Sequence, residues 1–205
     1  MILNDSEKEL ISKEIENLEK LSSAQLVAVI AKRSSNYKYA SLMICVFFVF
    51  LVSFVLFFIK EVSTLELLQY QLLIFVGINL LFEKFDNLIL KILPQNYKQR
   101  KASLYAKEQF SNLGLSRTKS KQAIMFFVSF DERYVKVITD NKISQEIPNE
   151  FWQQLVFEFA EDVKREDFLN GYLKAIRTSK AILIKHFPIQ KDSENELSNE
   201  VIELS

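Results

Sequence analysis

The sequence is poor in the residues that most often carry chemistry or shape loops. Its 205 residues include one cysteine, one histidine, three glycines and three prolines. A single cysteine, Cys45, excludes an internal disulfide and a zinc site built from several cysteines. The sequence also lacks a phosphate-cradling glycine loop, a nucleophile elbow and a zinc-binding helix motif. The common signatures of nucleotide-binding, acyl-transfer and zinc enzymes are therefore missing.

Charged residues are absent from one long stretch. Tyr39 to Ile59 contains twenty-one residues without a charge, and it holds six of the eighteen phenylalanines. As a helix it is roughly 31 Å long, which matches the hydrocarbon thickness of a bilayer. It starts too far from Met1 and is too long for the apolar core of a signal peptide. We therefore predict a membrane-spanning helix over 39–59.

A less apolar stretch follows after a short loop. Leu67 to Phe82 is uncharged, and extending it back to Val62 adds only one charged residue, Glu66. We predict a second membrane-spanning helix over 62–82, which forms a transmembrane hairpin with the first. Basic residues cluster at the outer ends of this hairpin, whereas its loop holds Lys60 alone. By the positive-inside rule, both chain ends are expected on the cytoplasmic side.

A short amphipathic helix is expected directly after the hairpin and before Pro94. Its apolar residues recur at helical spacing and are Phe85, Leu88, Ile89, Ile92 and Leu93. Residues 84–121 hold nine Lys or Arg against two acids, which suits contact with anionic lipid headgroups. The residues predicted to make this contact are Lys84, Lys91, Lys98, Arg100 and Lys101. Nucleic acid is not expected as a partner, because no RNA- or DNA-reading motif accompanies the basic residues.

The remaining segments predict a small α/β domain. Helices are expected over 4–21 and 98–113, after Asn149 as N-cap, and from Asp167 as cap to the HFP at 186–188. Strands are expected over 24–32, 123–130 and 134–140. Ser6 and Glu9 have the spacing of a capping box for the first helix. Residues 189–205 are polar and acidic without a long apolar stripe, so we expect a disordered acidic tail.

The first strand has no partner in its own part of the chain. Ala24 to Lys32 is an almost continuous apolar run, which is typical of a strand buried on both faces. We predict that it pairs in parallel with 123–130 across the hairpin, and that 134–140 adds antiparallel. Residues 4–36 and 95–188 are then two parts of one domain, interrupted by 37–94.

Several segments together resemble a known family. The most specific is FVSFDERYVKVITD at 127–140 followed by HFP at 186–188; SSAQLVAVIAKRSSNY before the hairpin and FLNGYLKAI at 168–176 add to it. Residues 4–188 resemble the bacterial membrane-spanning branch of the TPM domain family. The resemblance implies an α/β sandwich and a place in the bacterial cytoplasmic (inner) membrane. Some relatives are linked to acid-phosphatase activity with bound calcium and others to photosystem II repair.

The sequence departs from the wider family at two places. Extracytoplasmic members carry Asp-Asn-Gly before the strand that corresponds to 123–130, and a glycine-rich segment after the following strand. Here those places read SKQA and TDNKIS. The groups that would hold calcium or phosphate in those relatives are largely missing, which argues against phosphatase activity.

Four acids remain as catalytic candidates: Asp131, Glu132, Asp140 and Asp167. The first two follow one strand and Asp140 ends the next, so they lie at opposite ends of a hairpin and cannot share one ion unaided. Asp131 and Glu132 are interpreted as charged residues of a solvent-facing turn. The sequence therefore favours a non-catalytic binding or membrane-protein assembly factor. The alternative is a metal-assisted phosphatase that uses these carboxylates, with calcium as the cofactor that the resemblance implies.

Overall fold

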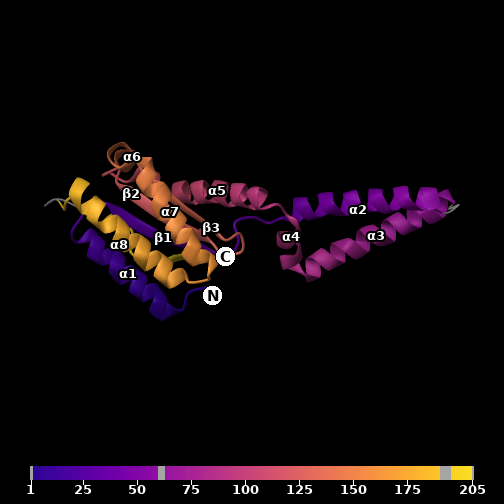
Figure 1. Ribbon diagram of the computed structural model, residues 1–205, viewed down its shortest axis with the longest axis horizontal. Coiled ribbons are helices and arrows are strands. Elements are labelled where there is room, and N and C mark those ends of the chain that lie inside the picture. The colour runs from indigo at the N-terminus through magenta and orange to yellow at the C-terminus, as the bar shows by residue number, and fades with distance from the viewer. Residues whose placement is uncertain (1, 60–62, 190–194, 205) are drawn as a thin grey trace. The chain divides into compact units, whose positions relative to one another are not determined.

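The computed structural model describes residues 2–59, 63–189 and 195–204 (Figure 1). The chain divides into two compact units. The first joins residues 1–34 to residues 99–205, and the second spans residues 35–98. The first unit is an α/β domain and the second is a helical hairpin, so the predicted α/β fold split by two apolar helices is confirmed.

The first unit is built on a four-stranded sheet in the order β3-β2-β1-β4. Its strands are β1 (Gln25–Ala31), β2 (Ala123–Ser129), β3 (Tyr134–Thr139) and β4 (Ile202–Leu204). β1 and β2 are parallel, with Gln25 opposite Ala123 and Ala31 opposite Ser129. β3 pairs with β2 in antiparallel orientation. The prediction that the N-terminal strand pairs with 123–130 across the helical hairpin is therefore confirmed.

Both central strands are buried along their whole length. Side chains alternate between the two faces of a strand. In β1, Leu26, Ala28 and Ile30 enter one core, while Val27, Val29 and Ala31 enter the other. The continuous apolar runs in the sequence thus mark strands that are covered on both faces.

The predicted disordered tail is wrong for its last residues. Ile202–Leu204 form β4, which lies parallel to β1 with Val29 opposite Ile202. The carboxylate of Glu203 accepts a hydrogen bond from Lys8 Nζ at 2.6 Å and another from the backbone N–H of Ile2 at 3.2 Å. Three residues are too few for a recognisable pattern, and only the open edge of β1 makes them a strand. Residues 190–194 and 205 lie outside the described part of the predicted tail.

Three helices cover one face of the sheet: α1 (Asp5–Glu19), α7 (Asn149–Lys164) and α8 (Phe168–His186) (Figure 1). Tyr172 of α8 is fully buried there, and its hydroxyl donates to the carbonyl oxygen of Val29 at 2.6 Å. Trp152 of α7 belongs to the same core, as its position on an apolar stripe predicts.

The second face carries a smaller core. Ala106 and Phe110 of α5 (Gln95–Asn112) and Leu115 of the short helix η1 (Leu115–Arg117) pack against it. Between them Gly114 has φ +74°, a left-handed conformation that glycine adopts without strain. α5 is the crossover that connects β1 to its parallel neighbour after the hairpin.

The predicted ends of two helices are wrong, and one short helix was not predicted. The capping box of α1 uses Asn4 and Glu7, because the helix begins at Asp5, two residues before the start that Ser6 would give. Asn149 is the first residue of α7, and Pro148 precedes the helix as its N-cap. The short helix α6 (Asn141–Glu146) was missed, because six residues hold too little of a helical repeat to be recognised.

The second unit contains α2 (Lys38–Ile59), α3 (Thr64–Lys84) and α4 (Asp86–Ile92). The predicted start of the second span, Val62, lies outside the described residues, and α3 begins behind a capping box of Ser63 and Glu66. Gln71 of α3 donates from its side-chain amide to Ser53 Oγ of α2 at 2.9 Å. α4 ends before Pro94, as predicted.

Most apolar side chains of α2 and α3 face outward. Of the most apolar window in each helix, only 6% is buried. The more exposed side chains include Phe47, Phe50, Phe54, Phe57, Phe58, Leu65, Leu68, Leu72 and Leu73. Both helices are long and apolar enough to cross a membrane.

Candidate functional site

The turn between β2 and β3 places the first two candidate acids. Asp131 and Glu132 follow the end of β2, and Arg133 has φ +49°, which lets the chain reverse into β3. Beside this turn, β1 continues as Lys32, Arg33 and Ser34. The N–H of Asp131 donates to the carbonyl oxygen of Lys32 at 3.0 Å, so the segments that follow β1 and β2 stay paired beyond the sheet.

The Asp131 side chain forms an ion pair across this junction. Its Oδ2 lies 2.6 Å from Arg33 Nε, and only 11% of the Asp131 side chain is exposed. Arg33 comes from the N-terminal part of the chain, before the hairpin, whereas Asp131 comes from the part after it. This pair therefore joins the two halves of the split domain.

Glu132 is buried, with 1% of its surface exposed. Its two carboxylate oxygens lie 3.2 and 3.3 Å from the backbone N–H of Ser34, and Oε2 also accepts from Ser129 Oγ at 2.5 Å. The hydroxyls of Ser34 and Ser129 are hydrogen-bonded to each other. We call Arg33, Ser34, Ser129, Asp131 and Glu132 the seam.

The interpretation of these acids as a solvent-facing turn is therefore wrong for Glu132. A charged pair between two strands resembles an exposed hairpin tip when only local sequence is considered. The groups that bury it, Arg33 and Ser34, stand almost a hundred residues earlier. Only the parallel pairing of β1 and β2 brings them to the turn.

Asp167 lies at the same end of the sheet. It caps α8, accepting from the Asn170 backbone N–H at 3.4 Å and from Asn170 Nδ2 at 2.9 Å, as predicted for a helix start. The rings of Phe168 and Phe130 are 5.2 Å apart, which brings this helix start to the end of β2. Next to it, Glu166 lies 3.2 Å from Arg133.

Asp140 lies at the opposite end of β3, as the sequence predicts. Its backbone N–H donates to the carbonyl oxygen of Ala123, and its Oδ1 accepts from the backbone N–H of Asn141 at 2.7 Å. Six residues of β3 separate it from the turn, about 20 Å of strand. It therefore acts as the cap of α6, far from the seam.

Each candidate carboxylate at the turn and at the start of α8 is engaged by groups within the protein. Calcium takes six to eight oxygen ligands, usually with several carboxylates. Within the described residues, no three His, Cys, Asp or Glu side chains lie close enough to hold a metal ion. Asp131 is engaged by Arg33, Glu132 by the serines, and Asp167 by its own helix. The arrangement suits a rigid junction between strands.

His186 ends α8, where a charged imidazole would complement the helix dipole. Its Nδ1 lies 3.9 Å from Glu146 Oε2, a weak contact with α6. The neighbours of the single histidine thus match a helix-end role.

Lys136 is not among the predicted site residues, although it stands in the middle of an apolar strand. It is half-buried on the α5 side of β3, and its Nζ donates to Ser103 Oγ. Burial, and to a smaller extent the nearby Lys107, lower the pKa of Lys136. A lysine between valines in an otherwise apolar strand is the signal that could have identified it.

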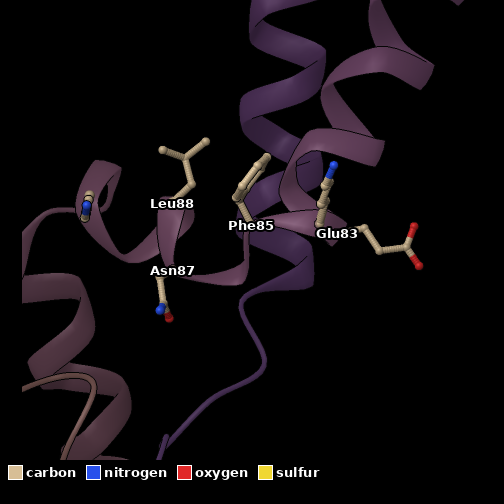
Figure 2. Close-up of a pocket in the computed structure, with 6 residues that line it drawn as sticks. Glu83, Phe85, Asn87 and Leu88 are labelled. Carbon is tan, nitrogen blue, oxygen red and sulfur yellow. The ribbon is translucent and has the colours of Figure 1, made fainter.

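A groove is present in the second unit, where α3 ends and α4 begins. It has a volume of about 540 Å³ and is lined by Glu83, Lys84, Phe85, Asn87, Leu88 and Lys91. In Figure 2, Phe85 and Leu88 point to one side, Asn87 points to the opposite side, and the Glu83 carboxylate points away from all three. We call this feature the basic groove.

Comparison with known proteins finds a family for most of the chain that follows the hairpin. The family model described as "TPM domain" matches residues 88–182. The chain carries a TPM domain. The match begins after the hairpin, so α1 and β1 lie outside it, although β1 is a central strand of the sheet. The compact unit that holds most of the matched residues therefore also includes residues that precede the hairpin.

A solved structure shares the fold. It is the NMR structure of the BA42 protein from the psychrophilic bacterium Bizionia argentinensis, with a TM-score of 0.60 and 16% sequence identity. The alignment covers 98% of this chain and 94% of that chain. At this identity the likeness shows a common fold alone. No curated protein sequence matches the chain.

Proposed function

We propose that the protein is a membrane-anchored TPM-domain protein of the bacterial cytoplasmic membrane. In this proposal α2 and α3 span the bilayer, and the TPM domain lies on the cytoplasmic face. The observation that carries it is the outward-facing apolar surface of both helices, which water would solvate poorly. The basic residues at the outer ends of the hairpin support cytoplasmic chain ends.

We propose further that the TPM domain acts as a non-catalytic binding or membrane-protein assembly factor. The seam supports this role, because its carboxylates are occupied in holding β1 to the β2–β3 turn. Ser34 lies four residues before α2, so the seam fixes the strand from which the anchor departs. In this proposal the partners of the domain are anionic lipid headgroups or another membrane protein.

The anchor can be tested in cells. The full chain should stay in the membrane fraction after alkaline carbonate washing and should dissolve in detergent. A reporter fused after Ser205 should be active only if it is a type that works in the cytoplasm. Activity of a reporter that works only after export would overturn the proposed topology.

A metal-assisted phosphatase is the second candidate. It is favoured by one observation: Asp131, Glu132 and Asp167 all lie at the carboxyl end of β2. Purified protein should give only background turnover of generic phosphomonoesters with calcium or magnesium. Turnover that is lost in both Asp131→Asn and Asp167→Asn would favour the enzyme over the binding factor.

A further inference from the structure

The basic groove combines two lysines with an apolar wall. Lys84 ends α3 and Lys91 lies in the last turn of α4, and both line the groove. Among the side chains that the structure describes, which do not include those of 1, 59–62, 86, 190–194 and 205, no carboxylate forms an ion pair with either lysine. Lys84 Nζ lies 5.7 Å from the centre of the Phe85 ring. The two cations therefore remain available to an anion from outside the protein.

The apolar wall consists of Phe85 and Leu88. Phe85 is 52% exposed, although a large aromatic ring is usually buried when a core is available. Both side chains point to the same side of α4 in Figure 2, and Asn87 points away from it. A ligand that fills this groove needs an anionic group for the lysines and an apolar part for Phe85 and Leu88.

One of the lysines predicted to contact lipid headgroups, Lys98, has a partner within the protein. Lys98 Nζ donates to the carbonyl oxygen of Leu90 at 2.8 Å, near the C-terminal end of α4. A basic side chain at this position satisfies a carbonyl group that the short helix leaves open. Lys98 thus stabilises α4 itself, and Lys84 and Lys91 remain as the cations of the groove.

We propose that the basic groove binds the headgroup of an anionic phospholipid. Its phosphate lies between the ammonium groups of Lys84 and Lys91, and its first acyl carbons contact Phe85 and Leu88. This inference rests on the proposed membrane anchor, because α3 then ends at headgroup depth. Charge complementarity selects an anionic lipid over a zwitterionic one, since each lysine near a negatively charged surface contributes favourably.

The test uses the full chain purified in detergent and titrated with phosphatidylglycerol or phosphatidylcholine, with bound lipid counted by native mass spectrometry. We expect phosphatidylglycerol to be retained in preference, and Lys84→Gln/Lys91→Gln to reduce its retention by roughly tenfold. The matched control is Lys13→Gln/Lys20→Gln, which removes the same charge at the same spacing from α1 and its C-cap. It should bind like the natural chain.

Three results would contradict the proposal that the basic groove binds an anionic phospholipid headgroup. They are equal retention of both lipids, unchanged retention in Lys84→Gln/Lys91→Gln, and displacement of the lipid by an equal concentration of inorganic phosphate, which would indicate a free-phosphate site. Carbonate washing separates this failure from failure of the anchor. If the natural chain is released by carbonate, the proposed anchor is wrong; if it stays and shows no lipid preference, only the groove is wrong.

Discussion

The two compact units differ in the burial of their apolar side chains. In the TPM domain, Phe126 and Phe127 are fully buried between the sheet and its helices. In the hairpin, Phe57 and Phe58 are 75% and 69% exposed. The same residue type stabilises the first unit by leaving water and gives the second unit a surface suited to lipid. The comparison teaches that composition alone does not separate a buried core from an outward-facing apolar surface.

The largest expected effect contrasts one phenylalanine from each unit. Phe127→Ala removes a fully buried ring and should lower the free energy of unfolding of the TPM domain by about 3–5 kcal/mol. Phe57→Ala should leave that free energy unchanged. Denaturant unfolding followed by Trp152 fluorescence measures it, because this single tryptophan lies in the TPM-domain core. Equal losses in the two variants would break the contrast between the units.

A pH effect should be confined to the TPM domain. Burial raises the pKa of Glu19 from 4.5 to about 7, although its Oε1 accepts from the backbone N–H of Leu26 at 3.0 Å. The folded state therefore binds a proton that the unfolded state releases above pH 4.5. This stability is fully present below that pH and is lost as pH rises through 7, by about 3 kcal/mol in all.

The variant Glu19→Gln keeps the acceptor oxygen and removes the titration. Its unfolding free energy should stay nearly level between pH 5 and pH 8, while that of the natural chain falls. Trp152 fluorescence at the two pH values measures the difference. The idea fails if the natural chain gains stability over this interval or if the variant keeps the same slope.

The seam should matter more than an exposed carboxylate of the same domain. Glu132→Ala leaves the Ser34 N–H and the Ser129 hydroxyl without their buried acceptor, which costs about 1–3 kcal/mol of unfolding free energy. Glu161→Ala, which removes an exposed partner of Lys164, should leave the unfolding midpoint unchanged. Identical midpoints for the two variants would mean that the seam does not hold the split domain together.

The smallest contrast compares glycines of the two units. A Cβ at Gly171 would lie 2.8 Å from the buried Phe159 ring, so Gly171→Ala should cost about 1–3 kcal/mol. At Gly77 in α3, nothing lies within 4 Å of the added Cβ, and Gly77→Ala should be tolerated. Unfolding followed by Trp152 fluorescence measures the first variant, and yield after carbonate washing measures the second. Tolerance of Gly171→Ala would show that α7 and α8 pack less closely than the structure describes.

Local sequence was sufficient where the signal was long and repeated. The uncharged run over 39–59, the apolar strands and the helical stripe around Trp152 each extend over many residues, so hydrophobic periodicity predicts them well. Even the parallel pairing of β1 with β2 followed from sequence, because each half of the domain held an apolar strand that lacked a partner. The fold was therefore largely predictable.

The candidate site was less predictable because its contacts join residues far apart in the chain. Local sequence predicts that Asp131 and Glu132 form an exposed tip, whereas the fold places Arg33 and Ser34 in contact with them. Short elements failed for a related reason: Ile202–Leu204 become a strand only because the edge of β1 is open to them. The sequence by itself determined the elements, the split and the two apolar helices, since these depend on local patterns of burial. Tertiary structure alone decided which charges are buried, because a carboxylate can be buried only where distant donors converge on it.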